Sequence, residues 1–141
     1  MFRSFNLSSA TRIFSSDCSS SQLSIPSGLD PNFISYDKQV VEAYINDPLV
    51  ENKLTSRLAS EMFVSLPGMI PAATKLKIPT MMQLGSEDEA FHPDSWVALF
   101  DAIAIEDKVF KKYDGFRHET YNEVKKELPL GDLKDWLNKH N

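Results

Sequence analysis

The sequence feature that most constrains the fold is the apolar run at residues 78–85, IPTMMQLG. It is short, nearly continuously apolar, led by a proline and closed by Gly85, which favours a strand covered on both faces of a parallel sheet. A helix with proline in its first turn is predicted for residues 93–104, and a second strand for residues 107–115. This order of strand, helix and strand predicts a parallel pair with a right-handed crossover.

Helical patterns flank this unit on both sides. We predict a short helix at residues 37–47, capped by Asp37, and a longer one at residues 51–65 that Pro67 and Gly68 should end. A short helix at residues 122–127 and a terminal helix at residues 130–140 follow. These helices carry more apolar surface than a sheet of two strands can cover, and such a sheet has two open edges. The sequence therefore predicts an α/β chain that is part of a larger sheet.

Net charge, apolar content and the numbers of cysteine and histidine argue against several classes of function. A net charge of -5 argues against nucleic-acid binding, and no apolar run approaches the roughly 18 residues that span a bilayer. The single cysteine, Cys18, excludes an internal disulfide and lies in a polar serine-rich run that would position a nucleophile poorly. The spacing of His92, His118 and His140 matches no compact zinc site. We expect no metal, no cofactor and a cytoplasmic protein.

Residues 1–24 form a serine-rich leader with Arg3 and Arg12 and no acidic residue before Asp17. We favour a poorly ordered leader, as would remain where a longer protein was cut or started late. A mitochondrial transit peptide also suits this composition and stays open as the alternative.

Two titratable residues follow the two predicted strands. Asp88 lies in the loop after the first strand and His118 in the loop after the second. Parallel neighbours are about 5 Å apart and end at one edge of a sheet, so these loops can bring the carboxylate to the imidazole. An aspartate so placed fixes the tautomer of a histidine that acts as a base. Taken alone, such a pair is more often structural than catalytic, and Glu87 or Glu89 could replace Asp88 as the partner.

From Ile25 to its end the chain resembles the C-terminal half of the monoacylglycerol lipase family of α/β hydrolases. Residues 25–50 resemble the family's cap segment, residues 85–88 (GSED) its G-x-x-D acid loop, residues 113–123 its histidine loop, and residues 132–137 its final helix. The resemblance implies a partial α/β-hydrolase fold: a cap-like helical segment at 25–75, then a C-terminal portion at 76–141. That portion would hold the last two parallel strands and flanking helices, with the N-terminal half of the sheet missing.

The resemblance also implies hydrolysis of acylglycerols or similar lipid esters, with Asp88 orienting His118 as the general base and no cofactor. The family's nucleophile is a serine in G-x-S-x-G. Glycines stand here only at 28, 68, 85, 115 and 131, so that motif is absent, as is the family's His-Gly oxyanion dipeptide. Ser86 is near Asp88 in sequence, but nothing places it on a strained turn. We therefore expect little activity from this chain alone.

Two further alternatives remain open at this point. The chain could be a non-catalytic remnant that folds against a partner supplying the missing strands, or that associates with itself.

The apolar stretch at residues 62–71, MFVSLPGMIP, favours a helix end packed on the sheet. The family resemblance instead implies an acyl-chain pocket that can touch a membrane, and hence a membrane-peripheral protein.

Overall fold

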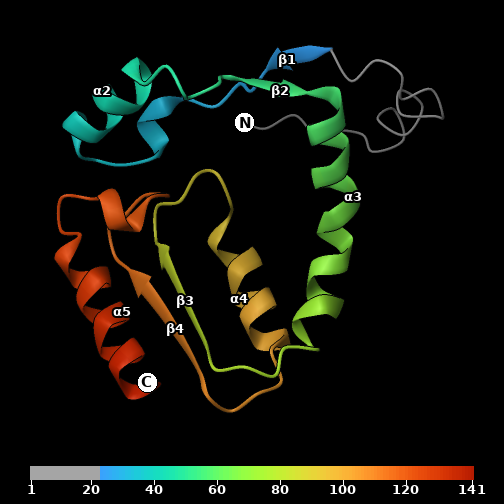
Figure 1. Ribbon diagram of the computed structural model, residues 1–141, viewed down its shortest axis with the longest axis vertical. Helices are drawn as coiled ribbons and strands as arrows, with labels where there is room; N and C mark the ends of the chain where they lie inside the picture. The colour runs from blue at the N-terminus through green and yellow to red at the C-terminus, as the bar shows by residue number, and fades with distance from the viewer. Residues whose placement is uncertain (1–22) are drawn as a thin grey trace.

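The computed structural model describes residues 23–141, so Cys18 and most of the predicted leader lie outside the described residues. The elements and their arrangement are shown in Figure 1. They are β1 (Ser24–Pro26), the 3₁₀ helix η1 (Pro31–Phe33), α2 (Lys38–Asn46), β2 (Lys53–Thr55), α3 (Ser56–Ala73), β3 (Thr80–Gly85), α4 (Pro93–Ala102), β4 (Lys108–Tyr113), the 3₁₀ helix η2 (Thr120–Asn122) and α5 (Glu127–Lys139).

The strands β3 and β4 pair in parallel, as predicted from the sequence. Their register runs from Thr80 opposite Lys108 to Gly85 opposite Tyr113. Both strands therefore end at the same edge, and the loops that leave them start side by side. The two parallel strands that the sequence predicted for this part of the chain are therefore present.

The helices α4 and α5 lie on either side of this strand pair (Figure 1). Side chains alternate between the two faces along each strand. Phe110 of β4 contacts Phe100 of α4, with ring centroids 5.1 Å apart. Gln83 and Tyr113 face α5 and bond to it. The strand pair is thus covered on both faces, as the apolar character of residues 78–85 indicated.

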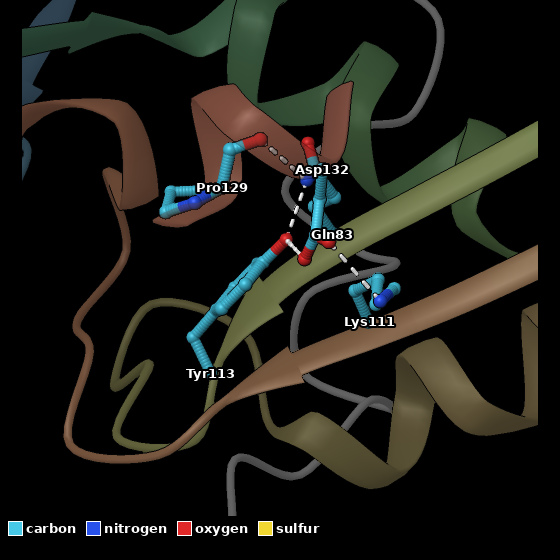
Figure 2. A network of polar contacts seen from close by, with 5 residues as sticks. All are labelled: Gln83, Lys111, Tyr113, Pro129 and Asp132. Atoms are coloured by element: carbon cyan, nitrogen blue, oxygen red, sulfur yellow. Dashed lines mark hydrogen bonds and ion pairs between the residues drawn. The ribbon is translucent and has the colours of Figure 1, made fainter. Parts of the chain in front are cut away.

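A polar network joins α5 to the strands (Figure 2). The Tyr113 hydroxyl donates to Asp132 Oδ2 at 2.8 Å, and Gln83 Nε2 donates to the Tyr113 hydroxyl at 2.6 Å and to the Pro129 carbonyl at 2.9 Å. Lys111 Nζ lies 3.2 Å from Asp132 Oδ1. Burial and the Asp132 carboxylate both raise the pKa of the Tyr113 hydroxyl. This network fixes α5 against the carboxyl-terminal part of β3 and β4.

The long helix α3 corrects one prediction. It does not end at Pro67 and Gly68 but continues through them and Pro71 to Ala73. A proline removes one backbone donor and strains the preceding turn, yet its fixed φ is itself helical, so a helix can pass through it. The two prolines are about one turn apart, so the missing hydrogen bonds fall on one side of the helix.

The C-terminal elements also differ from expectation. Residues 122–127 do not form a helix of their own, because a 3₁₀ turn ends at Asn122 and α5 begins at Glu127. The predicted terminal helix therefore begins earlier than residue 130. Pro129 falls in its first turn, where no backbone donor is needed, so it does not delay the helix. The short antiparallel pair of β1 and β2 was not predicted.

The apolar stretch at residues 62–71 is not packed on the sheet. Phe63 is 70% exposed and Val64 is 73% exposed, and Met62, Leu66, Met69 and Ile70 are each at least 40% exposed. The expectation that this part of α3 packs on the sheet is therefore wrong for the described residues. Within residues 23–141, no helix has the length and apolar character needed to cross a lipid bilayer.

Candidate active site

The loops after β3 and β4 bring Asp88 and His118 into contact. Asp88 Oδ2 lies 2.9 Å from Nδ1 of His118. The Asp88 side chain is 4% exposed and that of His118 is 34% exposed. A shielded carboxylate thus lies behind an imidazole that solvent or a ligand can still reach.

The orientation of the Asp88 carboxylate is set by its own loop. Its Oδ1 accepts hydrogen bonds from the backbone N–H groups of Ala90 at 2.8 Å and Phe91 at 3.1 Å. Since Oδ1 is occupied in this way, Oδ2 is the oxygen turned to His118. Glu87, which the sequence left open as a partner, instead accepts from the Tyr36 hydroxyl. Glu89 is exposed, and among residues 23–141 the carboxylate that contacts the His118 ring is that of Asp88.

The contact with Asp88 also indicates the tautomer of His118. An ionised carboxylate is only an acceptor, so Nδ1 carries the hydrogen and Nε2 of the neutral ring is an acceptor. Within residues 23–141, Nε2 has no hydrogen-bond partner. Phe33 and Phe91 both lie beside the ring, with centroid separations of 6.2 Å and 5.7 Å. An apolar surround of this kind leaves Nε2 available to a substrate or nucleophile.

The loop that carries His118 is fixed to the end of β3. The Glu87 N–H donates to the Phe116 carbonyl at 2.9 Å, and the Ser86 N–H donates to the Tyr113 carbonyl at 2.9 Å. The Ser86 hydroxyl accepts from the N–H of Gly115, which has a φ of 72°, at 2.9 Å. Ser86 therefore serves the loop as a hydrogen-bond partner.

A segment far away in the sequence supports the same loop. The N–H of His118 donates to the Phe33 carbonyl at 3.4 Å, and the N–H of Glu119 donates to the Ile34 carbonyl at 2.8 Å. Sequence reasoning missed Phe33 and Phe91 as neighbours of His118. Only the folded chain places them there, and no spacing in the sequence signals it.

The other two histidines bond to other partners. His92 precedes α4, and its Nδ1 accepts from the Asp94 N–H at 3.4 Å. His140 Nε2 lies 2.9 Å from Asp107 Oδ2, and its Nδ1 lies 2.7 Å from the Trp136 carbonyl. Over residues 23–141, no cluster of three or more histidine, cysteine, aspartate or glutamate side chains could hold a metal ion.

Comparison with known proteins extends these observations. Residues 6–125 match the family described as serine aminopeptidase, S33. A monoacylglycerol lipase of Mycolicibacterium smegmatis is 33% identical over 113 residues, which cover 79% of this chain and 40% of that protein. The phospholipase YtpA of Bacillus subtilis is 26% identical over 74% of this chain and 41% of its own length.

Solved structures agree on the fold. The crystal structure of the Paleococcus ferrophilus monoacylglycerol lipase superposes with a TM-score of 0.81 and 28% identity, covering 84% of this chain and 47% of that one. A soluble variant of the Saccharomyces cerevisiae monoglyceride lipase superposes with a TM-score of 0.72 at 22% identity, which supports the fold alone. The chain spans less than half the length of each of these relatives. It belongs to the serine aminopeptidase S33 family of α/β hydrolases and corresponds to part of that fold.

Proposed function

We propose that this chain is the acid–base portion of a serine hydrolase that acts on acylglycerols or similar lipid esters. The observation that carries the proposal is the 2.9 Å contact between Asp88 and His118, which leaves Nε2 as an unpartnered acceptor among the described residues. The named activities of the relatives favour lipid esters as the substrate class.

In the proposed reaction, Nε2 of His118 removes the proton from a serine hydroxyl as its oxygen attacks the ester carbonyl. The imidazolium then gives that proton to the departing alcohol, and water repeats the cycle on the acyl-serine intermediate. Asp88 remains ionised throughout, holds Nδ1–H and stabilises the imidazolium. The apolar rings of Phe33 and Phe91 beside the imidazole suit an approach by the lipid ester.

The nucleophile would come from outside the sequence of this chain, which lacks G-x-S-x-G. Loss of a single oxyanion-hole donor costs about 10²–10³-fold in kcat, and here the donors and the serine are lacking together. We therefore propose that the chain alone is nearly inactive. Hydrolysis of a p-nitrophenyl ester by the isolated chain, abolished by His118→Ala, would contradict this part of the proposal.

The test of the whole proposal restores the nucleophile. The part of the Paleococcus ferrophilus lipase that this chain does not align with is fused ahead of residues 25–141. The fusion is expected to hydrolyse short esters and to react with a fluorophosphonate. Asp88→Asn should lower kcat by about 10⁴-fold because the wrong tautomer is then held. Glu89→Gln is the matched control and should leave kcat unchanged. A folded, active fusion that tolerates both Asp88→Asn and His118→Ala would refute the proposal.

A second candidate is a non-catalytic chain that folds against a partner or a second copy. Within residues 23–141, β3 pairs with β4 only, so its other edge is open. The indole N–H of Trp96 is shielded from solvent without a hydrogen-bond acceptor among those residues, and it borders a cavity lined by Met82, Gln83 and Leu84. An added strand would supply acceptors there. Size-exclusion chromatography with light scattering tests this candidate, and a folded monomer would argue against it.

A further inference from the structure

Glu123 is a buried carboxylate that the Asp88–His118 pair does not use. The residue is only 3% exposed. A buried carboxylate is tolerated only where hydrogen bonds replace its water. Glu123 Oε1 accepts from the N–H of Arg117 at 2.8 Å, and Oε2 accepts from the N–H of Tyr36 at 3.0 Å. Oε2 also lies 3.2 Å from the hydroxyl of Ser35.

These donors come from two separate parts of the chain. Arg117 directly precedes His118, whereas Ser35 and Tyr36 lie between η1 and α2. Ser35 is itself only 2% exposed, and its hydroxyl also lies 2.9 Å from the Asn122 carbonyl. The carboxylate thus joins a segment of the cap-like region to the loop that carries the imidazole.

The same segment also bonds to the backbone at His118 and Glu119. The Phe33 carbonyl accepts from the His118 N–H and the Ile34 carbonyl accepts from the Glu119 N–H. A second link runs through side chains, because the Arg117 guanidinium lies 3.9 Å from the ring centroid of Tyr36. Residues 117–119 are therefore held by several contacts with residues 33–36, and the Glu123 carboxylate accepts hydrogen bonds from both segments.

We propose that Glu123 is a positioning residue that couples residues 33–36 to the imidazole of His118. A ligand or partner that shifts residues 33–36 would then shift Arg117 through the carboxylate and change the alignment of His118 with Asp88. The inference rests on the proposed role of His118 as the base. It adds that the position of residues 33–36 affects how the His118 ring is aligned. Asp88 sets the tautomer, and Glu123 sets where the ring lies.

The test uses the full chain labelled with ¹⁵N and measures two properties that a general loss of stability would not change selectively. One is the Nδ1–H resonance of His118, which reports the hydrogen bond to Asp88. The other is hydrogen exchange at the amides of Tyr36, Arg117 and Glu119. Glu123→Gln keeps the shape of the side chain but replaces one acceptor oxygen by an NH₂ group, which cannot accept from a backbone N–H.

We expect Glu123→Gln to shift or broaden the His118 Nδ1–H resonance. We also expect it to speed exchange at Tyr36 or Arg117 at least about ten-fold, as for loss of a hydrogen bond to a charged group. Glu127→Gln, at an exposed site in α5, is the matched control and should change neither. A folded Glu123→Gln chain with an unchanged His118 resonance and unchanged exchange would overturn the proposal.

Ser35→Ala keeps the proposal testable if Glu123→Gln fails to fold. It removes one contact of Glu123 from the side of residues 33–36 and leaves the contact with Arg117 in place. A smaller shift of the same His118 resonance supports the coupling, and no shift refutes it. These measurements need no turnover. An inactive fusion protein would count against the hydrolase proposal alone, whereas an unmoved resonance would count against the coupling alone.

Discussion

Gly85 lies directly against the backbone carbonyl of Arg117, so that a Cβ added at Gly85 would be 2.2 Å from that oxygen. The Phe116 carbonyl oxygen would be equally close, at 2.2 Å. The last residue of β3 is thus in direct contact with the backbone of the loop that carries His118. This contact gives a physical reason for glycine at the start of the acid loop.

Gly85→Ala should destabilise the chain and displace the loop, because both clashing atoms are backbone. Overpacking of this kind typically costs about 1–3 kcal/mol, and the approach here is close. Urea denaturation measures the free energy of unfolding, and the His118 Nδ1–H resonance reports the loop. Gly131→Ala is the control: a Cβ there meets nothing within 4 Å. In the helix α5 it should stabilise by about 0.5–1 kcal/mol. Equal effects from the two substitutions would contradict this account.

The contact of His140 with Asp107 predicts a pH dependence. The Trp136 carbonyl, and after it the Asp107 carboxylate, raise the pKa of His140 above its ordinary value of about 6.5. The hydrogen bond from His140 in turn lowers the pKa of Asp107, so that carboxylate stays ionised near neutral pH. Since the folded pKa of His140 is raised, its stabilising effect is fully present below about pH 6.5 and is lost as pH rises through the folded value.

Asp107→Asn should therefore lower the titration midpoint of His140 in NMR spectra. It should also cost more stability at about pH 6 than at about pH 9. Glu106→Gln changes the neighbouring exposed carboxylate and should do neither. A His140 midpoint that does not respond to Asp107→Asn would show that the carboxylate has no influence on this imidazole.

Tyr113→Phe tests the network in Figure 2. The substitution removes the hydroxyl that donates to Asp132, while Lys111 still contacts Asp132 and the Pro129 carbonyl still accepts from Gln83. Because both former partners keep another contact, the loss should be about 1 kcal/mol in the free energy of unfolding. The pKa of Asp132 should rise, since the Tyr113 hydroxyl is the main group that lowers it. Tyr44→Phe is the control and should change stability by less than about 0.5 kcal/mol.

Pro67 offers a test of the long helix. Pro67→Ala restores a backbone donor inside α3 and should stabilise the chain, by at most the roughly 3 kcal/mol that separates the two residues in a helix interior. Pro93→Ala, at the first turn of α4, should give no such gain because that turn needs no donor. Circular dichroism during thermal unfolding compares the two variants. A gain at Pro93 as large as that at Pro67 would be inconsistent with an unbroken α3.

The parts predicted from the sequence are those that local pattern determines. The strand at Thr80–Gly85, the helix at Pro93–Ala102 and the strand at Lys108–Tyr113 follow from apolar periodicity and turn residues. Parallel pairing then brings the loops of Asp88 and His118 to one edge of the sheet, because the carboxyl ends of parallel neighbouring strands lie side by side. The length of α3 was missed since a proline is read as a stop, although its φ is compatible with a helix.

The surroundings of His118 could not be predicted in the same way. Tyr36 and Glu123 are 87 residues apart, and their contact depends on how the segment between η1 and α2 folds against the loop after β4. Nothing in the spacing of polar residues distinguishes Glu123, which is buried, from Glu119 or Glu127, which are not. Long-range contacts between single residues require the tertiary structure.

The adjacency of β3 and β4 has a consequence for how such a protein can be divided. Asp88 and His118 are carried by successive strands of one continuous stretch, and their supporting residues begin at Phe33. A gene interrupted anywhere ahead of the codon for Pro31 would still encode Asp88, His118 and the supporting residues 33–36 on one polypeptide. A break inside α4 would separate them, so recombination and protein splitting should tolerate the first boundary and not the second.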